Sequence, residues 1–142
     1  MKNFRKVVAA LFLSFIIVPV AIAIEREEKV VYHMNDGALP MAGLRNIRNH
    51  LNASPKAKIV VVTHGPGIDF LLEDAQDKNG NPYEVIVQEL SSRGVKFRVC
   101  DNTLKSRKID KDKVLPEATI VPSGVAEVAR LQVEEGYAYL KP

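Results

Sequence analysis

The sequence predicts an α/β fold in which a mainly parallel, five-stranded sheet is covered by helices on both faces. Short apolar runs of strand length alternate with longer amphipathic stretches. The run at 57–63 is β-branched and almost wholly apolar after Lys58, as in a central strand that is covered on both faces. Because parallel connections are right-handed crossovers, each helix should return the chain to the start of the next strand.

The first 23 residues have the layout of a secretory signal peptide. Lys2, Arg5 and Lys6 precede an apolar run at 7–18, and Ala21-Ile22-Ala23 follows as a small-x-small cleavage site. A retained membrane anchor is the alternative, but a helix needs about 20 apolar residues to cross a bilayer. We therefore expect cleavage after about Ala23, export to the periplasm, no stable membrane anchor, and a single α/β domain at 24–142.

The charge of the exported chain is balanced. Residues 1–23 hold three of the 20 Lys and Arg residues and none of the 17 Asp and Glu residues. The excess of positive charge therefore belongs to the leader, and it gives no support to a nucleic-acid or anionic-membrane partner.

The first half of the domain predicts two strands and three helices. A strand at 30–34 precedes a helix ending near Leu51, in which Leu44, Ile47 and Leu51 recur at helical spacing. After the strand at 57–63, we expect a short helix at 68–75, an exposed turn at 77–82 and a helix at 83–93 that ends at Gly94.

The second half predicts three strands and two helices. A strand at 95–100 ends at Cys100, and Asn102 is expected to cap a short helix through about Arg107. A polar connector at 110–117 should pack over the sheet edge. A strand at 118–121, a helix at 123–135 and a strand at 137–140 complete the domain. The expected buried face of the last helix is Val125, Val128, Ala129 and Gln132.

The carboxyl ends of the predicted strands carry most of the polar candidates. In parallel sheets, functional sites collect at that edge. The residues expected there are Asn35 and Asp36, Thr63 and His64, Cys100 and Asp101, and Ser123 and Gly124.

Cys100 is the only cysteine, so it cannot close an internal disulfide. At the end of a strand, just before a helix, its sulfur should face free backbone N–H groups that favour the thiolate. Lys105 and Arg107 would add to this effect, whereas Asp101 would oppose it. The alternative is an inert cysteine in the core, and the sequence leaves the two readings open.

The three histidines, His33, His50 and His64, match no compact metal-binding motif. We therefore predict no metal site. His33 and His64 are expected to hydrogen-bond loop carbonyls, and His50 to be a solvated residue at a helix end. A second role is open to His64, which with Asp69 would orient or protonate a leaving sulfur.

Two glycine-containing turns offer backbone N–H groups to an anion such as thiosulfate or phosphate. They are Gly65-Pro66-Gly67 and Ser123-Gly124. The alternative is an ordinary turn and an ordinary helix cap. The sequence has no Ser-His-Asp ordering and no nucleotide-binding glycine fingerprint.

Four segments carry a family resemblance. Cys100 is followed by Arg107 and Ile109, and the segments at 32–36, 62–69 and 121–127 read YHMND, VTHGPGID and VPSGVAE. Together and in this order they resemble exported members of the DsrE/DsrF-like sulfur-relay family over about residues 29–142. Many members have Gly after the Arg, where this chain has Lys108, so the loop after the short helix is expected to differ.

The resemblance implies a three-layer α/β/α fold, a homo-oligomer (trimer or hexamer), and a persulfide on Cys100. The implied function is a sulfur carrier or sulfurtransferase-like relay without metal or organic cofactor, whose partners are a sulfur donor and an acceptor thiol, as proteins or small sulfur compounds. The alternative is a non-catalytic oligomeric module that binds a small anion or metabolite at its subunit interface. The predicted anion- or substrate-binding residues are Asn35, Asp36, Gly65, Gly67, Asn102, Thr103, Arg107, Ser123 and Gly124.

Overall fold

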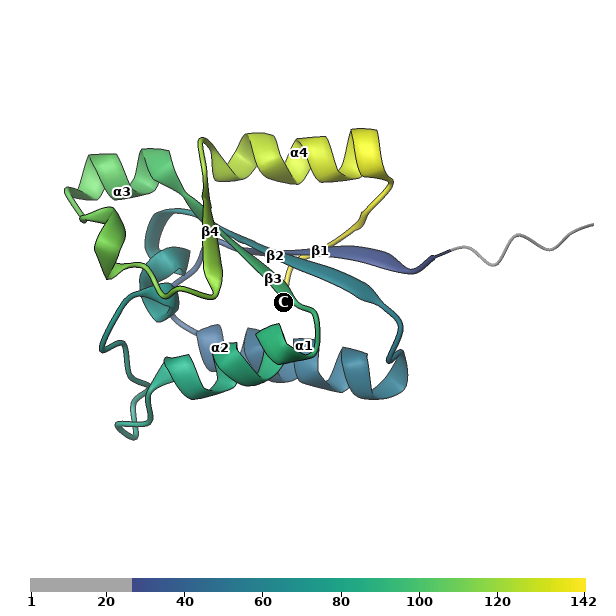
Figure 1. Ribbon diagram of the computed structural model, residues 1–142, viewed down its shortest axis with the longest axis horizontal. Helices are drawn as coiled ribbons and strands as arrows, with labels where there is room; N and C mark the ends of the chain where they lie inside the picture. Colours follow the sequence, from purple (N-terminus) through teal and green to yellow (C-terminus); the bar gives the residue numbers. More distant parts are fainter. Residues whose placement is uncertain (1–26) are drawn as a thin grey trace, which may run out of the picture.

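A parallel five-stranded sheet forms the centre of the molecule (Figure 1). The computed structural model describes residues 27–142, so the predicted signal peptide at 1–23 lies outside the described residues. The spatial order of the strands is β4-β3-β2-β1-β5, and every neighbouring pair is parallel. This confirms the predicted fold class. The strands are β1 (Lys29–Met34), β2 (Lys58–Thr63), β3 (Lys96–Cys100), β4 (Ala118–Val121) and β5 (Ala138–Leu140).

The middle strand is β2, as its composition predicts. It pairs with β1 on one side and with β3 on the other. Each residue from Ile59 to Thr63 is buried, because helices cover both faces of the sheet at this point.

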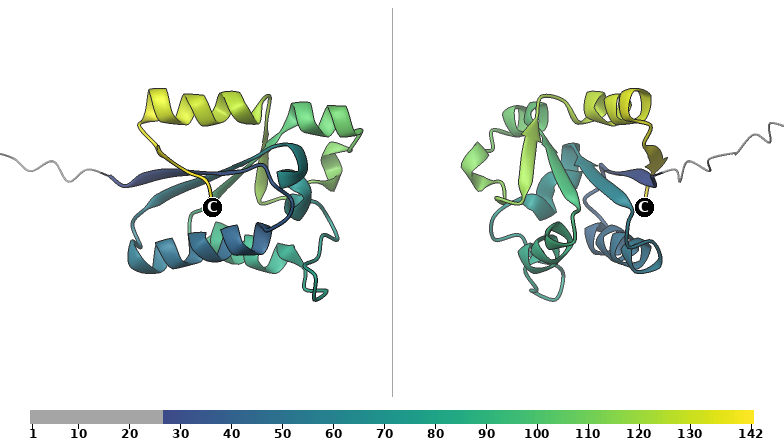
Figure 2. Two further views of the ribbon diagram at one scale, coloured as in Figure 1. Left: turned by 180° about the vertical axis from the view of Figure 1, so that it is seen from behind. Right: turned by 45° about the vertical axis from the view of Figure 1, so that its right-hand side comes forward.

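Helices lie on both faces of the sheet (Figure 2). One face is covered by α1 and α2, which enclose the larger core, and the other is covered by α4. The helices are α1 (Pro40–Ala53), η1 (Gly65–Leu71), α2 (Tyr83–Ser92), α3 (Asp101–Arg107), η2 (Lys111–Lys113) and α4 (Gly124–Glu135), of which η1 and η2 are 3₁₀-helices. No helix within residues 27–142 has the length and apolarity that a bilayer-spanning segment needs.

Strand alternation decides which residues face α4. Tyr32 and Met34 belong to the core under α1 and α2, whereas Val31 packs with Val128 and Leu131 of α4. Side chains alternate along a strand, so His33 also points to the α4 face. The same rule places His64 and Cys100 on that face, since both residues have extended backbones directly after Val62-Thr63 and Arg98-Val99.

The buried face of α4 differs from the prediction. Val128 is buried as expected, but Val125 is 60 % exposed, Ala129 and Gln132 are exposed, and Leu131 is buried instead. The first residue of the helix, Gly124, packs against the ends of β2 and β3. This contact rotates the helix so that positions 124, 128 and 131 face the sheet.

Two short helices also differ from the predicted boundaries. The helix expected at 68–75 is the 3₁₀-helix η1 and ends at Leu71. The predicted cap Asn102 lies inside α3, and the residue at the N-cap position is Cys100 itself. The chain turns into the helix two residues earlier, so the thiol is closer to the first free N–H groups than the sequence indicates.

The connector at 110–117 packs against the chain after η1. Val114 and Leu115 are buried, and the Leu115 N–H donates to the carbonyl of Leu71 over 2.9 Å. The loop after α3 begins at Lys108, which adopts the left-handed conformation with φ of 55°. This is a conformation that glycine favours, and Lys108 occupies the position where the resemblance expects Gly.

Candidate functional site

The candidate site lies at the carboxyl edge of the sheet, where β3 turns into α3. Cys100 ends β3 and is 5 % exposed. Its neighbour on the same face of the sheet is His64. Thr63 of β2 is paired with Val99 of β3, and His64 and Cys100 are the residues that come directly after them. The structure thus brings together two of the predicted site residues.

The thiol of Cys100 is surrounded by hydrogen-bond donors. Burial acts to raise the pKa of the thiol, as it does for any group that ionises to an anion. Donor groups near the sulfur act in the opposite sense and lower the pKa; they are the backbone N–H groups of Gly124, Thr103 and Asn102 and the Thr103 hydroxyl. The donors outweigh burial, and the pKa of Cys100 lies below its ordinary value.

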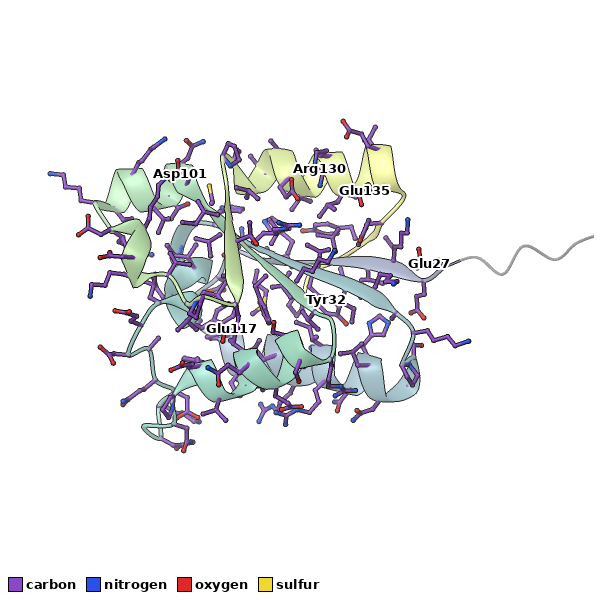
Figure 3. All side chains as sticks on the ribbon, in the orientation of Figure 1. Glu27, Tyr32, Asp101, Glu117, Arg130 and Glu135 are labelled. Atoms are coloured by element: carbon purple, nitrogen blue, oxygen red, sulfur yellow. The ribbon has the colours of Figure 1, made fainter. Side chains whose placement is uncertain are left out.

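The carboxylate of Asp101 is paired away from the thiol. Its two oxygens lie 2.8 Å from Lys105 Nζ and 2.9 Å from Lys111 Nζ, and Figure 3 shows Asp101 at the start of α3. These two ammonium groups hold the pKa of Asp101 below its usual range. The sequence predicts that Lys105 favours the thiolate and that Asp101 opposes it. In the structure, the two residues form one ion cluster with Lys111, in which the charge of Asp101 is neutralised.

Position 124 leaves no room for a side chain, because three groups crowd the place where a Cβ atom would lie. A Cβ atom there would lie 3.0 Å from the Thr63 carbonyl oxygen, 3.1 Å from His64 Cβ and 3.3 Å from Cys100 Cβ. The close approach lets the N-terminus of α4 reach the sulfur with its N–H group. Gly67 in η1 also allows a close backbone approach, since a Cβ atom there would overlap the Met34 carbonyl at the end of β1.

Thr103 links the thiol to the loop after β2. Its hydroxyl accepts a hydrogen bond from the Gly65 N–H over 2.9 Å and donates one toward the sulfur of Cys100. Gly65 has a φ of 55°, a conformation that is strained for other residues. The N–H of this predicted anion-binding glycine is therefore already occupied by Thr103.

Asp69 is paired with Arg107 rather than with His64. Arg107 Nη1 lies 2.6 Å from Asp69 Oδ1 and 3.3 Å from the Gly65 carbonyl oxygen. The guanidinium therefore clamps η1 to α3. Among the described residues, no hydrogen bond joins Asp69 to His64, and the salt bridge directs the Asp69 carboxylate toward α3.

The histidines form side-chain pairs, so the expectation of loop carbonyls and a solvated His50 is wrong. His33 Nε2 lies 2.7 Å from His64 Nε2, and His33 Nδ1 lies 2.8 Å from the Tyr139 hydroxyl. His50 has a side chain that is only 15 % exposed and contacts Tyr32 and Glu28 on the α1 side of the sheet. His33 meets His64 because β2 lies beside β1, and it meets Tyr139 because β5 lies on the other side of β1. His50 meets Tyr32 because α1 lies against β1.

Burial lowers the pKa of both His33 and His64, and the nearby ammonium of Lys141 lowers each pKa further. For His33, the neighbouring His64 adds to the effect. The pair is therefore neutral near pH 7. Within residues 27–142, no group of three or more His, Cys, Asp and Glu side chains is placed to hold a metal ion.

Of the remaining predicted residues, Asp36 and Ser123 hydrogen-bond within their own turn or helix, and Asn35 lines a small pocket. Asp36 accepts a bond from the Ala38 N–H in its own turn, and Ser123 caps α4 by accepting from the Ala126 N–H. Asn35 has a buried side-chain oxygen without a partner among the described residues. It lines a small pocket of about 80 Å³ with His33 and Lys141. A larger hollow lies at the opposite edge of the sheet, beside Ser54 and Lys96, and has neither a cysteine nor a histidine.

Two residues of this edge, His33 and Tyr139, are not among the predicted site residues. The sequence predicts only a loop-carbonyl hydrogen bond for His33 and a place in the last strand for Tyr139. The alternation of the strands provides a signal for the face on which each lies, but the neighbourhood of β5 and β1 does not appear in the sequence order.

The comparisons with known proteins agree on the family and the fold. A family model described as the DsrE/DsrF-like family matches residues 15–142. The chain is similar to the solved structure of MTH1491, a protein of unknown function from Methanobacterium thermoautotrophicum, with 32% sequence identity and a TM-score of 0.71 over 82% of this chain and 100% of that one. The YchN protein of E. coli has the same fold, with a TM-score of 0.65 and 12% identity over 82% of this chain and 99% of that one. No curated protein matches the chain.

Proposed function

Because the chain belongs to the DsrE/DsrF-like family, which is of the sulfur-relay type, we propose that it is a periplasmic sulfur carrier that forms a persulfide on Cys100. The observation that carries the proposal is the set of donors around the thiol. The thiolate is the nucleophile in sulfur transfer, and the donors from α3 and α4 favour the thiolate despite burial.

The transfer needs no metal and no organic cofactor. The Cys100 thiolate attacks the terminal sulfur of a donor persulfide R–S–SH, the donor S–S bond breaks, and R–S⁻ leaves with the electron pair. The product is a Cys100 persulfide, Cys–S–SH. With thiosulfate as donor, the leaving group is sulfite and the product is Cys–S–S⁻. Transfer to an acceptor thiol repeats the exchange, so nothing is oxidised or reduced overall.

Access to the sulfur sets the size of the donor. Cys100 is 5 % exposed, so small sulfur compounds are its first donors in this proposal, and an acceptor thiol must approach at the carboxyl edge. The carrier is a homo-oligomer, a trimer or hexamer. Support for association comes from the exposed apolar side chains of Val125 and Val133 on α4.

The test is intact-mass analysis of the exported protein after incubation with a polysulfide or thiosulfate. We expect a gain of one sulfur atom in the wild-type chain and none in Cys100→Ser, since the chain has no other cysteine. Treatment with a small thiol should remove the added sulfur. The absence of any gain would instead favour the alternative, a non-catalytic oligomeric module that binds a small anion or metabolite at its subunit interface.

The periplasmic location has its own test. If the leader is cleaved after Ala23, N-terminal sequencing of protein recovered from the periplasm should show a chain that begins at or near Ile24. Recovery of the intact Met1 chain in the membrane fraction would contradict the proposed location, and leave the sulfur chemistry to be judged by the mass analysis.

A further inference from the structure

Four side chains form a row across four neighbouring strands on the α4 face of the sheet. They are Tyr139 of β5, His33 of β1, His64 after β2 and Cys100 of β3. The first two contacts in the row are hydrogen bonds, one of 2.8 Å between the Tyr139 hydroxyl and His33 Nδ1 and one of 2.7 Å between His33 Nε2 and His64 Nε2.

The strand pairing gives the position of each member of the row along the sheet. Tyr139 is paired with Val31, two residues before His33 on the same face. His33 is paired with Val62, two residues before His64. His64 and Cys100 then stand at the same level on neighbouring strands, and the side-chain-free Gly124 lies against the Cβ atoms of both.

We propose that His64, His33 and Tyr139 form a proton path that connects the Cys100 thiol to solvent during sulfur transfer. The inference rests on the proposed persulfide chemistry and adds a role for three residues. His64 accepts the thiol proton, directly or through one water, whereas His33 and Tyr139 are positioning residues that act through His64.

The hydrogen bond between the two imidazoles allows the neutral pair to accept one additional proton and no more than one. A neutral imidazole has one N–H donor and one acceptor nitrogen. In the Nε2–Nε2 bond, one ring must donate and the other must accept, and a second added proton would set two N–H groups against each other. The pair therefore behaves as a single base.

Tyr139 determines which nitrogen of His64 is left to accept a proton. When His33 Nδ1–H donates to the Tyr139 oxygen, His33 Nε2 accepts from His64 Nε2–H, and His64 Nδ1 is the free acceptor. When the Tyr139 hydroxyl donates to His33 Nδ1, each ring switches, and His64 Nδ1 bears the proton. Within residues 27–142, no hydrogen bond involves His64 Nδ1, so this nitrogen is left to accept a proton.

The other end of the row reaches water. Tyr139 is 43 % exposed on the edge strand β5, so its hydroxyl can exchange protons with solvent. A proton received at His64 Nδ1 can thus be matched by one released at Tyr139, without rotation of either imidazole ring.

The surrounding charges keep the pair neutral before the reaction. The Lys141 ammonium follows β5 and lowers the pKa of both rings, together with burial. Cys100 faces the pair from β3. On α4, the carboxylate of Glu127 is held by Arg130 at 2.9 Å and faces Arg98 at 3.9 Å, so it offers the pair no free negative charge.

The proton balance of one turnover closes through this row. The Cys100 thiol gives its proton to the imidazole pair, and the thiolate takes the terminal sulfur from R–S–SH. The leaving R–S⁻ then receives a proton that returns from solvent through Tyr139 and the pair. The sum is Cys–SH and R–S–SH giving Cys–S–SH and R–SH, with the imidazoles returned to neutrality.

The experiment compares wild type with His64→Gln, His33→Gln and Tyr139→Phe, and uses His50→Gln as the matched control on the opposite face of the sheet. Two rates are measured against pH on the whole exported protein: persulfide formation with a polysulfide, and alkylation by iodoacetamide. We expect His64→Gln to slow persulfide formation near pH 7 by about 10²-fold. His33→Gln and Tyr139→Phe should move the half-maximal rate to higher pH, and His50→Gln should match wild type.

Tyr139→Phe keeps the test decisive if a histidine variant fails to fold, because it removes only one exposed hydroxyl. Unchanged pH profiles in the folded variants would overturn the proton path even if wild type gains sulfur. If wild type gains no sulfur, the proposed function fails, and the path is then judged by the alkylation profiles alone. A shift for His50→Gln as large as that for His33→Gln would also overturn the path, since it would show a general effect on the fold.

Discussion

Replacing Thr103 with valine should raise the pKa of Cys100 while leaving the fold in place. The substitution keeps the shape of the side chain and removes one hydroxyl that donates toward the sulfur and accepts from the Gly65 N–H over 2.9 Å. A hydrogen bond to a charged group contributes about 1.5 kcal/mol at the lower end of its range. Since one pKa unit corresponds to about 1.4 kcal/mol, the pKa of the thiol should rise by about one unit.

The assay is the rate of iodoacetamide alkylation as a function of pH. Because Cys100 is buried, slow access scales the rate equally at every pH, and the midpoint of the profile is the quantity to compare. Below both midpoints, the variant should react about tenfold more slowly than wild type. The free energy of unfolding should also fall by about 1 kcal/mol, since the Gly65 N–H loses its acceptor.

Thr119→Val is the matched control, because Thr119 is an exposed residue of β4 that undergoes the same isosteric change. Its alkylation midpoint should equal that of wild type. A Thr103→Val protein that is folded, destabilised and yet has the wild-type midpoint would refute the reasoning, since it would show that the hydroxyl supports the loop and does not act on the thiol.

Three further predictions concern the same edge. Gly124→Ala should lower the free energy of unfolding by about 1–3 kcal/mol and raise the alkylation midpoint, because the added methyl meets Thr63, His64 and Cys100; chemical denaturation checks this, with Gly43→Ala as a control whose nearest contact is the flexible end of Met34. Asp101→Asn should speed alkylation near neutral pH, opposite to Thr103→Val, because Lys105 and Lys111 keep their positive charges; an unchanged or slower rate would contradict it. Because burial and Lys141 lower the pKa of both His33 and His64 in the folded state, their contribution to stability should be complete above the unfolded pKa of about 6.5 and be lost as the pH falls through the folded values; urea titrations at several pH values should show this loss in wild type and not in the double variant His33→Gln/His64→Gln.

The order and type of the elements follow from local patterns, and the structure confirms most of them. The strand at 118–121 and the helix beginning after Ser123 have the predicted bounds within one residue. The β-branched run before His64 predicts the central strand because burial on both faces excludes polar residues there. The errors fall where a long-range contact changes a local preference. The contact of Gly124 with the ends of β2 and β3 rotates α4, so Val125 is exposed although its spacing predicts burial.

The site was predicted in part. Cys100 and His64 were expected at one edge because parallel strands end at the same edge, and the structure places them side by side. The partners of charged groups were not predictable, since Asp69 and Arg107 are far apart in the chain and meet only when η1 packs against α3. The same is true of Lys111, which returns from the connector to reach Asp101.

The sequence by itself determined the α/β class, the strand that carries the cysteine and the end of that strand at which the thiol lies, because these depend on periodicity and on turn residues that act over a few positions. Only the tertiary structure decided that β5 lies beside β1 and that α4 begins against the thiol. A crossover of one helix can return the chain to either edge of a sheet at similar cost in local conformation, so strand order is settled by packing. That packing joins Tyr139, His33 and His64 into one row ending at Cys100.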